Sequence, residues 1–548
     1  MRIALINEGT YPLAHGGVST WCHQLVSGLT GHTFTLVALS GLAASGKLAY
    51  DLPGNVSTVR NVAVWDRPAP ARGMLARRRR RRAAAEAAAG LLWGMFTEGP
   101  AGVDAFGAAL RQLAVLSDDG AHPLHDVPLA GPLRHAWRSA RLTQQDIRLP
   151  LPGLSRQEAM DAGMLLEHAL RPLAHQLGQV DVCHAVAAGL PLLVALAAKW
   201  RDGVPYLITE HGVYLRERYL ERNPAVTPAV KTIMLRFYRA LAKIGYAEAG
   251  LVTSVSRFNQ RWERRLGAPA TRTMVVPNGV SPDRYPPLTA TPQTPTIVWV
   301  GRIDPLKDLH TLVRAFALVR RSVPTAQLRL VGPVPSTNQP YADSCHALVG
   351  SLGLGGSVTF CGPVASSREA YAAGHVVALS SISEGMPYTV VEAMMCGRAT
   401  VSTDVGGVAD TVGDAGLVCA PGDPAAFAAA CVTLLTDHAR RDAIGAAARA
   451  RALENFSLSR MLDTYDALYT EVRLGVGGRL AEPAPIPARA LPARHGATTR
   501  PVAGSQPVSG PQPLNVGPSI RSRTMARMPR QVRRQPVETD AAALSGRR

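Results

Sequence analysis

Short apolar stretches alternate with longer helical patterns along most of the chain, and this alternation limits the possible fold more than any other feature. Ten such stretches occur, at 2–7, 33–39, 179–184, 206–209, 251–255, 297–300, 327–331, 358–360, 376–380 and 400–402. Apolar runs of this length, rich in β-branched residues and separated by helices, are typical of buried strands in parallel sheets. The sequence therefore predicts an α/β fold.

The spacing of these stretches indicates two domains, and 548 residues of which 47% are hydrophobic are enough for two cores. We expect the first domain over 1–280, with an Ala/Arg-rich helical insertion at about 67–158, and the second over 281–457. A helix over 458–474 is expected to cross back to the first domain. The basic tail 475–548 is expected to be disordered. Two α/β domains joined by one linker predict a ligand cleft between the carboxyl ends of their strands.

The formal net charge of +19 is concentrated in two places, because residues 475–548 carry +9 and Arg77–Arg82 carry +6. No aromatic residues are interleaved with these arginines, and we find no nucleic-acid-binding motif, so we expect no nucleic-acid partner. Two interpretations remain. The arginines are solvated charge runs, or they attract an anionic membrane surface or polymer.

Several features predict a cytoplasmic protein, either free or peripheral at the inner face of the membrane. The N-terminal apolar run is interrupted by Asn7 and Glu8, which is unlike a signal peptide. The longest apolar stretch, 185–198, is too short to span a bilayer and favours a buried helix. The seven cysteines form no metal-type spacing and fit reduced thiols.

Two carboxylates, Glu384 and Glu392, stand eight positions apart directly after the apolar stretch 376–380. The sequence between them predicts a tight loop and then a short helix, which ends before Gly397. The N–H groups of a first helical turn, with the helix dipole, favour an anion. A carboxylate on each side of a phosphate site suits a nucleotide-sugar. The loop positions expected to bind it are Gly385, Met386 and Pro387, the last in the first turn.

A second group of charged candidates, Gly301, Arg302 and Lys307, follows the stretch 297–300. Sugar transfer from a nucleotide diphosphate requires stabilisation of the leaving pyrophosphate. Gly301 permits close approach of a ligand, Arg302 supplies a planar fork, and Lys307 supplies a point charge. Alone, such a pair is compatible with a solvated loop. In the same domain as the two glutamates, it favours phosphate binding.

The first domain offers further candidates. Gly16 and Gly17 follow its first strand and permit close approach of a phosphate or sugar, although a plain tight turn fits equally well. His211 ends another strand and is expected to contact the donor sugar. The weaker candidates are Glu210 (a partner of His211 or merely exposed), His184 and, in the second domain, Gly406-Gly407, beside the base or in a structural turn. No clustered His, Asp or Glu set indicates a required metal.

These residues together resemble the family 4 retaining glycosyltransferases of the GT-B fold, over about residues 1–472. The segments 8–12 and 209–214 are similar to the Pel-type exopolysaccharide glycosyltransferases. The resemblance implies two Rossmann-like parallel-sheet domains facing a cleft. Two departures stand out: the loop reads Ser383-Glu-Gly-Met-Pro387 where Pel-type chains tend to read Ser-Glu-Ala-Gln-Pro, and the Arg-rich insertion and tail are unmatched.

The resemblance also implies roles for the candidates. The position of Glu392 holds ribose hydroxyls, and those of Arg302 and Lys307 hold the diphosphate. Those of Glu384 and His211 lie at the donor sugar, and the Gly16-Gly17 pair lies near phosphate and acceptor. The implied reaction is metal-independent, retaining transfer from a UDP-glucose-like donor to a growing exopolysaccharide or other glycan. No cofactor is implied besides this substrate, and a membrane-bound synthase complex is the implied partner.

Two alternatives remain at this point. One is a catalytically silent GT-B subunit that scaffolds a membrane polysaccharide synthase through its Arg-rich segments. Packing alone does not require such charges at strand ends, which argues against silence. The other is a GT-B epimerase or phosphorylase. A phosphorylase would hold pyridoxal phosphate on a lysine, and the sequence offers no evident one.

Overall fold

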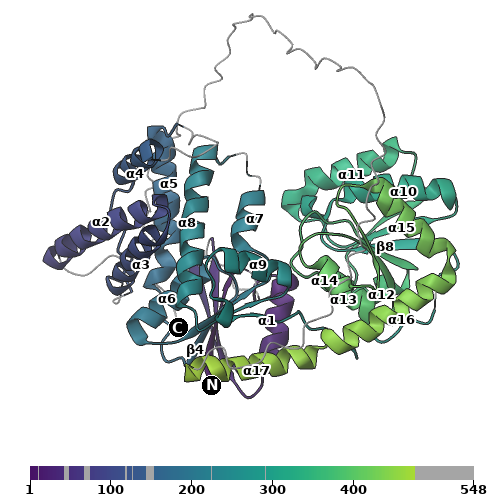
Figure 1. Cartoon of the computed structure of the whole chain (residues 1–548), viewed down its shortest axis with the longest axis horizontal. Helices are drawn as coiled ribbons and strands as arrows, with labels where there is room; N and C mark the ends of the chain where they lie inside the picture. Colours follow the sequence, from purple (N-terminus) through teal and green to yellow (C-terminus); the bar gives the residue numbers. More distant parts are fainter. Residues whose placement is uncertain are drawn as a thin grey trace, which may run out of the picture. The chain divides into compact units, whose positions relative to one another are not determined.

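A computed structural model describes residues 1–9, 11–41, 48–66, 74–117, 120–125, 127–143, 153–221, 223, 225–290 and 292–475. These residues all belong to one compact unit of the chain. They form two parallel β-sheets with helices packed on both faces of each, as Figure 1 shows. The expected disordered tail lies outside the described residues, except for Gly475.

The first sheet has seven described strands, all parallel, in the order β3-β2-β1-β4-β5-β6-β7. They are β1 (Arg2–Glu8), β2 (Thr33–Ser40), β3 (Val56–Ala63), β4 (Val182–Ala185), β5 (Tyr206–Glu210), β6 (Leu251–Ser254) and β7 (Thr273–Val275). All five stretches predicted for this domain are strands. The edge strand β3 was missed, because its side chains are largely exposed and it has no continuous apolar run.

Alternate side chains of β1 enter two separate cores, as the two-residue period of a strand requires. Ala4 and Ile6 pack against one set of helices, and Ile3 and Leu5 against another. The first set is α2 (Met74–Phe96), α3 (Pro100–Val115), α4 (Ala130–Thr143), α5 (Arg156–Ala169), α6 (Pro191–Asp202) and α8 (Pro228–Glu248). The second set is α1 (Gly17–Gly28) and α17 (Leu458–Leu474).

The apolar stretch 185–198 falls on the end of β4 and on α6, whose residues 191–198 are all buried. The expectation of a buried helix is therefore confirmed from Pro191 onwards. No helix within the described residues is long and apolar enough to cross a membrane.

The helices α2 to α5 occupy the region where the strand pattern is lost, and α5 continues past it. Helix α2 packs along α3, and glycines make this contact close. A Cβ atom added to Gly94 would lie 2.6 Å from the backbone nitrogen of Phe106, and one added to Gly102 would lie 2.1 Å from the carbonyl oxygen of Thr97. Larger residues at these two positions would separate the helices.

The second sheet has six described strands, all parallel, in the order β10-β9-β8-β11-β12-β13. They are β8 (Thr296–Val300), β9 (Gln327–Val331), β10 (Val358–Gly362), β11 (Val376–Leu379), β12 (Ala399–Thr403) and β13 (Leu417–Cys419). All five predicted strands of this domain are present, and the three-residue strand β13 was missed.

Helices pack on both faces of this sheet. They are α10 (Leu309–Ser322), α11 (Gln339–Ser351), α12 (Ser367–Ala372), α13 (Tyr388–Met395), α14 (Val408–Val412), α15 (Pro424–Thr436) and α16 (His438–Asn455). The remaining elements of the chain are α7 (Tyr214–Leu220), α9 (Arg257–Arg265) and the short 3-10 turns η1 (Arg171–Ala174), η2 (Ala270–Arg272), η3 (Pro305–Lys307) and η4 (Ser336–Asn338).

Helix α17 follows the second sheet in the sequence but packs against the first, on β4 and α1. Its Tyr469 hydroxyl lies 2.7 Å from Nδ1 of His184. Its Tyr465 hydroxyl lies 3.0 Å from Oγ1 of Thr209. The two tyrosines are buried, so α17 is held by both apolar packing and hydrogen bonds.

Candidate functional site

The carboxyl ends of β8 and β11 bring the charged candidates of the second sheet together. Gly301 and Arg302 directly follow β8, and η3 ends at Lys307. The hydroxyl of Thr389, in the first turn of α13, donates to the carbonyl of Val300 over 3.2 Å. The N-terminus of α13 therefore lies beside the end of β8, although Val300 and Thr389 are 89 positions apart in the sequence.

Lys307 and Glu384 form a preformed ion pair at this edge of the sheet. Nζ of Lys307 lies 2.6 Å from Oε1 of Glu384, and their side chains are 25% and 11% exposed. The Ser381 hydroxyl donates to the same oxygen over 2.6 Å. A carboxylate held by a cation and a hydroxyl keeps one orientation, and its second oxygen remains for a ligand.

Arg302 differs from Lys307 because it is exposed and makes no hydrogen bond or ion pair within the part of the chain described. Its planar guanidinium is thus available to bind an anion at the same strand end.

Glu392 lies in α13 and is fixed from behind by two hydroxyls. Its Oε2 accepts hydrogen bonds from Tyr371 over 2.7 Å and from Ser367 over 2.9 Å. Tyr371 is fully buried, and burial together with the charge of Glu392 raises the pKa of its hydroxyl well above the ordinary value. The carboxylate is therefore oriented before any ligand binds.

Helix α13 begins one residue later than predicted. Pro387 precedes it as the N-cap with an extended backbone, whereas the sequence favoured a proline in the first turn. The proline ring constrains the φ angle of Pro387, but this constraint is compatible with a position just before the helix. The Pro387 carbonyl accepts hydrogen bonds from the Val390 and Val391 N–H groups. Gly397 follows the helix with φ of 71°, as predicted. The Tyr388 and Thr389 N–H groups, the first two of the helix, have no backbone acceptor within the described residues.

The loop 383–387 contacts residues of the first sheet. A Cβ atom added to Gly385 would lie 1.7 Å from the carbonyl oxygen of His211, so only glycine fits there. The Asn278 amide donates to the Met386 carbonyl over 3.0 Å. Two further contacts come from Arg216, whose guanidinium donates to the Ser383 hydroxyl, and from Tyr388, whose hydroxyl donates to Gln24 over 3.0 Å.

His211 lies where the loop 383–387 contacts the first domain, a place called the junction below. Its ring packs edge-on against Trp21, with 4.6 Å between centroids. Its Nε2 is buried and has no hydrogen-bond partner within the described residues. Burial lowers the pKa of the imidazole to about 3, so the ring is neutral at neutral pH. A neutral imidazole with an unpartnered nitrogen is suited to a hydrogen bond with a bound hydroxyl.

His184 and Glu210 lie in the interior of the first domain and not at the junction with the loop 383–387. Both ring nitrogens of His184 have partners, because Nε2 lies 2.7 Å from the Thr209 hydroxyl and Nδ1 meets Tyr469. Glu210 is fully buried, which excludes the exposed alternative. Burial raises the pKa of its carboxyl to about 7, and that of the buried Glu263 carboxyl is raised by burial and by the charge of Glu210. These residues form the interior support of the His211 strand.

The pair Gly16-Gly17 lies in open space, whereas the pair Gly406-Gly407 is packed against backbone. A Cβ atom added to Gly16 would meet nothing within 4 Å, and one on Gly17 would lie 3.8 Å from the Tyr388 ring. The N-terminus of α1 is therefore open next to α13. Gly406 and Gly407 instead press against the loop, because added Cβ atoms would lie 1.6 Å and 2.4 Å from the carbonyl oxygens of Glu384 and Gly385. They hold the loop in place from behind.

Sequence reasoning missed five residues that the fold brings to this site: Ser367, Tyr371 and Ser381 behind the glutamates, and Arg216 and Asn278 at the loop. Isolated hydroxyls and single polar residues carry no spacing signal. Two of them lay close to a recognised motif: Ser381 stands three positions before Glu384, and Arg216 stands five positions after His211.

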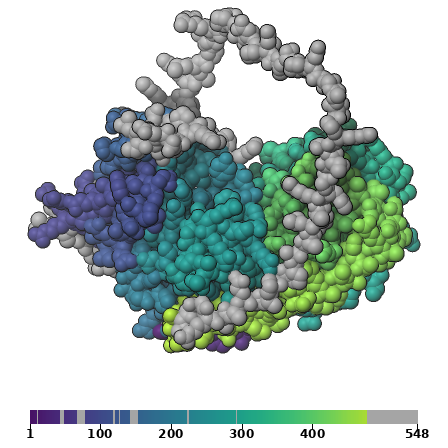
Figure 2. Space-filling view, viewed as in Figure 1, coloured from purple at the N-terminus to yellow at the C-terminus, as the bar shows by residue number. Residues whose placement is uncertain are grey.

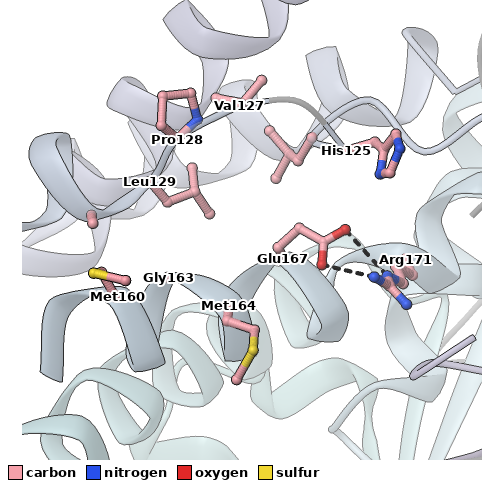
Figure 3. A pocket seen from close by; sticks show the side chains of 11 residues that line it. His125, Val127, Pro128, Leu129, Met160, Gly163, Met164, Glu167 and Arg171 are labelled. Atoms are coloured by element: carbon pink, nitrogen blue, oxygen red, sulfur yellow. Dashed lines mark hydrogen bonds and ion pairs between the residues drawn. The ribbon is translucent and has the colours of Figure 1, made fainter. Parts of the chain in front are cut away.

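A hollow of about 460 Å³ lies elsewhere, between the start of α4 and helix α5 (Figure 3). Its charged groups satisfy one another. Glu167 and Arg171 are 3.0 Å apart, and Arg171 also donates to the Val64 carbonyl over 2.8 Å. Burial raises the pKa of Glu167, but hydrogen bonds from His122 and Arg171 outweigh it and lower the pKa to about 2. This cluster ties the insertion to the end of β3.

Within the residues that the structure describes, no group of three or more His, Cys, Asp or Glu side chains is placed to hold a metal ion. All seven cysteines lie in the described part and are free thiols.

Comparison with known proteins bears on what this site does. Residues 1–271 match a family described as a domain of unknown function, and residues 294–437 match the family described as glycosyl transferases group 1. The D-inositol 3-phosphate glycosyltransferase of Rhodococcus opacus is 30% identical over 336 residues, which is 57% of this chain and 73% of that protein. The enzyme of the same name from Geodermatophilus obscurus is 30% identical over 346 residues, 59% and 73% of the two chains.

Solved structures share the two-sheet architecture. Anabaena HepE in complex with UDP and glucose superposes with a TM-score of 0.54 at 17% identity, covering 85% of this chain and 99% of that one. The sucrose-phosphate synthase of Thermosynechococcus elongatus gives a TM-score of 0.55 at 18% identity, covering 86% and 99%. At these identities the likeness bears on the fold alone. With the paired sheets, the charged strand ends and relatives at 30% identity, the chain belongs to the group 1 glycosyltransferases and has the GT-B fold.

Proposed function

We propose that this glycosyltransferase is a family 4 enzyme that transfers a hexose, with retention and without a metal, from a UDP-glucose-like donor to a growing exopolysaccharide or other glycan. The observation that carries the proposal is the preformed pair of Lys307 and Glu384 beside the start of α13, with Arg302 unpaired at the same strand end.

The leaving UDP carries the charge that must be stabilised. Arg302 binds the diphosphate through its guanidinium fork, Lys307 adds a second positive charge, and the first-turn N–H groups of α13 complete the site. Lys307 is neutralised by Glu384 before the donor binds. Arg302 therefore supplies the larger change in interaction when the phosphate arrives.

Glu392 orients the ribose. Its Oε2 is occupied by the Tyr371 and Ser367 hydroxyls, so Oε1 is the oxygen that accepts from the ribose hydroxyls. Because the carboxylate is held in advance, little ordering is required when UDP binds.

Glu384 and His211 position the donor sugar from opposite sides of the junction. The unpartnered Nε2 of His211 meets a sugar hydroxyl, and the second oxygen of Glu384 meets another. The acceptor hydroxyl attacks from the face that the UDP leaves, and its proton passes to the departing phosphate. The anomeric configuration is then retained.

The comparisons support the donor class more than the acceptor. HepE is described in complex with UDP and with glucose, whereas the curated relatives are named for transfer to D-inositol 3-phosphate. The exopolysaccharide acceptor rests on the Pel-type sequence similarity in the segments 8–12 and 209–214. Free thiols at all seven cysteines support a reducing, cytoplasmic setting.

The test is product analysis with the purified full-length protein. It would be incubated with UDP-glucose, UDP-GlcNAc and UDP-GalNAc, each with oligosaccharide acceptors or D-inositol 3-phosphate. Mass spectrometry would identify a product heavier by one hexose or one N-acetylhexosamine, according to the donor, and NMR would give its anomeric configuration. Inversion would refute the retaining mechanism, and transfer to inositol phosphate alone would refute the glycan acceptor. If no donor were turned over or hydrolysed and UDP did not bind, the site itself would be misassigned.

A further inference from the structure

The insertion contains a second, larger hollow that the transfer reaction does not use. It lies between α2 and α4, has a volume of about 770 Å³, and is lined mainly by the apolar groups of Trp93, Phe96, Pro132, Ala136 and Ala140. The Trp93 side chain is 52% exposed at its rim. An exposed tryptophan beside an apolar hollow is unusual on a fully solvated surface and is typical of a contact site.

One end of this hollow is strongly basic. Thr97 and Glu98 line both it and an adjoining small cavity, which is otherwise lined by side chains that include Arg236, Arg239 and Lys243 of α8. The Glu98 carboxylate lies 2.9 Å from Arg239 and 3.8 Å from Arg236. Three cations thus surround a single carboxylate. Lys243 has no ion pair within the described residues, and burial and the nearby Arg239 lower its pKa.

Helix α2 continues the basic character along its exposed face. Arg82 and Arg79 stand eleven and fourteen positions before Trp93, or about three and four helical turns, so all three project from one side of the helix. Arg82 and Arg79 are exposed. Figure 2 shows the outer surface of the insertion helices in purple to blue. Exposed cations of α2 therefore lie on the N-terminal side of Trp93, in addition to the α8 cations beside Glu98.

We propose that this groove, formed by Trp93, Phe96, Glu98, Arg239 and Lys243, docks the enzyme on a membrane surface containing anionic phospholipid. An acyl chain or the interfacial region of the bilayer contacts the hollow and the Trp93 indole. The phosphate of the lipid headgroup binds the three cations of α8 alongside the Glu98 carboxylate. Tryptophan and basic residues together are the combination that interfacial proteins place at the boundary between headgroups and hydrocarbon.

The arrangement favours a lipid over other occupants. An acidic protein surface would use the cations but would leave a deep apolar hollow unfilled. A second copy of this chain would bring the same positive charge to the contact. The sequence indicated an anionic membrane through the run Arg77–Arg82 and the tail 475–548. Arg80 of that run instead donates to the Ala121 carbonyl over 2.6 Å. The cations of α8 are the stronger anchor.

Binding of the full-length protein to vesicles tests this directly. Vesicles of phosphatidylcholine with or without 30 mol% phosphatidylglycerol would be compared by flotation, and tryptophan quenching by lipids brominated on the acyl chain would report insertion. We expect binding only to the anionic vesicles. Arg239→Gln with Lys243→Gln should weaken it about 30-fold, at ~1 kcal/mol for each basic residue near the surface. Trp93→Ala should remove most of the bromolipid quenching.

The matched control is Arg314→Gln with Arg321→Gln, which removes two exposed cations from α10 on the other sheet. It keeps the net charge equal and leaves the basic tail unchanged, and should weaken binding less than twofold. Equal loss in the two double variants, or no binding by the wild type, would overturn the proposal. So would an oligomer that dissociates in the Arg239/Lys243 variant without lipid, because a second copy would then cover the groove. UDP affinity should be unchanged in all variants, which separates this test from that of the catalytic site.

Discussion

Replacing Glu392 with alanine should produce two losses that can be measured separately. The first is a weaker hold on UDP, because the ribose loses hydrogen bonds to a charged acceptor. The second is lower stability, because the buried Tyr371 hydroxyl loses its acceptor 2.7 Å away. One carboxylate is responsible for both losses. Its Oε2 accepts the internal hydrogen bonds, and its Oε1 is left to accept from the ribose.

The magnitudes follow from the kind of hydrogen bond that is lost. A bond to a charged group contributes about 1.5–3 kcal/mol, so UDP affinity should fall roughly 10- to 150-fold. An orphaned buried hydroxyl costs about 1–3 kcal/mol, which should appear as a lower thermal unfolding temperature. The Ser367 hydroxyl loses the same acceptor, because it also donates to Oε2.

Isothermal calorimetry with UDP, together with thermal unfolding of the free protein, measures the two effects. Tyr371→Phe is the matched control, since it removes the inner hydrogen bond but leaves the carboxylate. It should change stability by about 1 kcal/mol and UDP affinity by less than threefold. UDP binding by Glu392→Ala at wild-type strength would refute the ribose role. Equal weakening in Tyr371→Phe would show that Glu392 acts only through packing.

Three further predictions concern other parts of the site. Arg302→Ala should lower kcat/KM by roughly 30- to 1000-fold, for the loss of about 2–4 kcal/mol of transition-state stabilisation, and wild-type turnover would remove it from the mechanism. The raised pKa of Glu210, from 4.5 to about 7, means that its contribution to stability is complete below pH 4.5 and is lost as pH rises through about 7. Glu210→Gln should therefore reduce the fall in the free energy of unfolding between pH 5 and 8 by up to about 3 kcal/mol, measured by denaturant unfolding at each pH; an unchanged slope would contradict this. Gly385→Ala should greatly reduce both activity and unfolding temperature, since its Cβ would lie 1.7 Å from the His211 carbonyl. Gly350→Ala, whose Cβ would meet nothing within 4 Å, is its control and should be neutral.

Much of the fold followed from local patterns, and its gaps have a physical cause. The buried strands of a parallel sheet are continuous apolar runs, so ten of the thirteen described strands were readable. Of the other three, β3 and β13 have exposed or half-buried side chains and resemble loops in sequence, and β7 has only three residues. Helix α13 was predicted from its Pro387 and Gly397 signals, with an error of one residue at its start.

The candidate site was partly readable for a similar reason. Arg302, Lys307, Glu384 and Glu392 stand at recognisable distances from strands, so their grouping at one sheet edge followed from the topology of parallel sheets. The orientation of each side chain did not. His184 and His211 both follow apolar strands, yet one is bound on both nitrogens within the core and the other keeps Nε2 unpartnered.

The sequence by itself determined that this chain forms parallel α/β domains and that a cationic and acidic set lies at the strand ends of the second. Those properties depend on neighbours along the chain, through apolar periodicity and helix-terminus signals. Tertiary structure alone decided that Tyr371 and Ser367 fix Glu392, that His211 contacts Gly385, and that Trp93 and Lys243 line adjoining cavities. Such contacts join residues that are distant in sequence, and no local pattern encodes which of many polar side chains will meet.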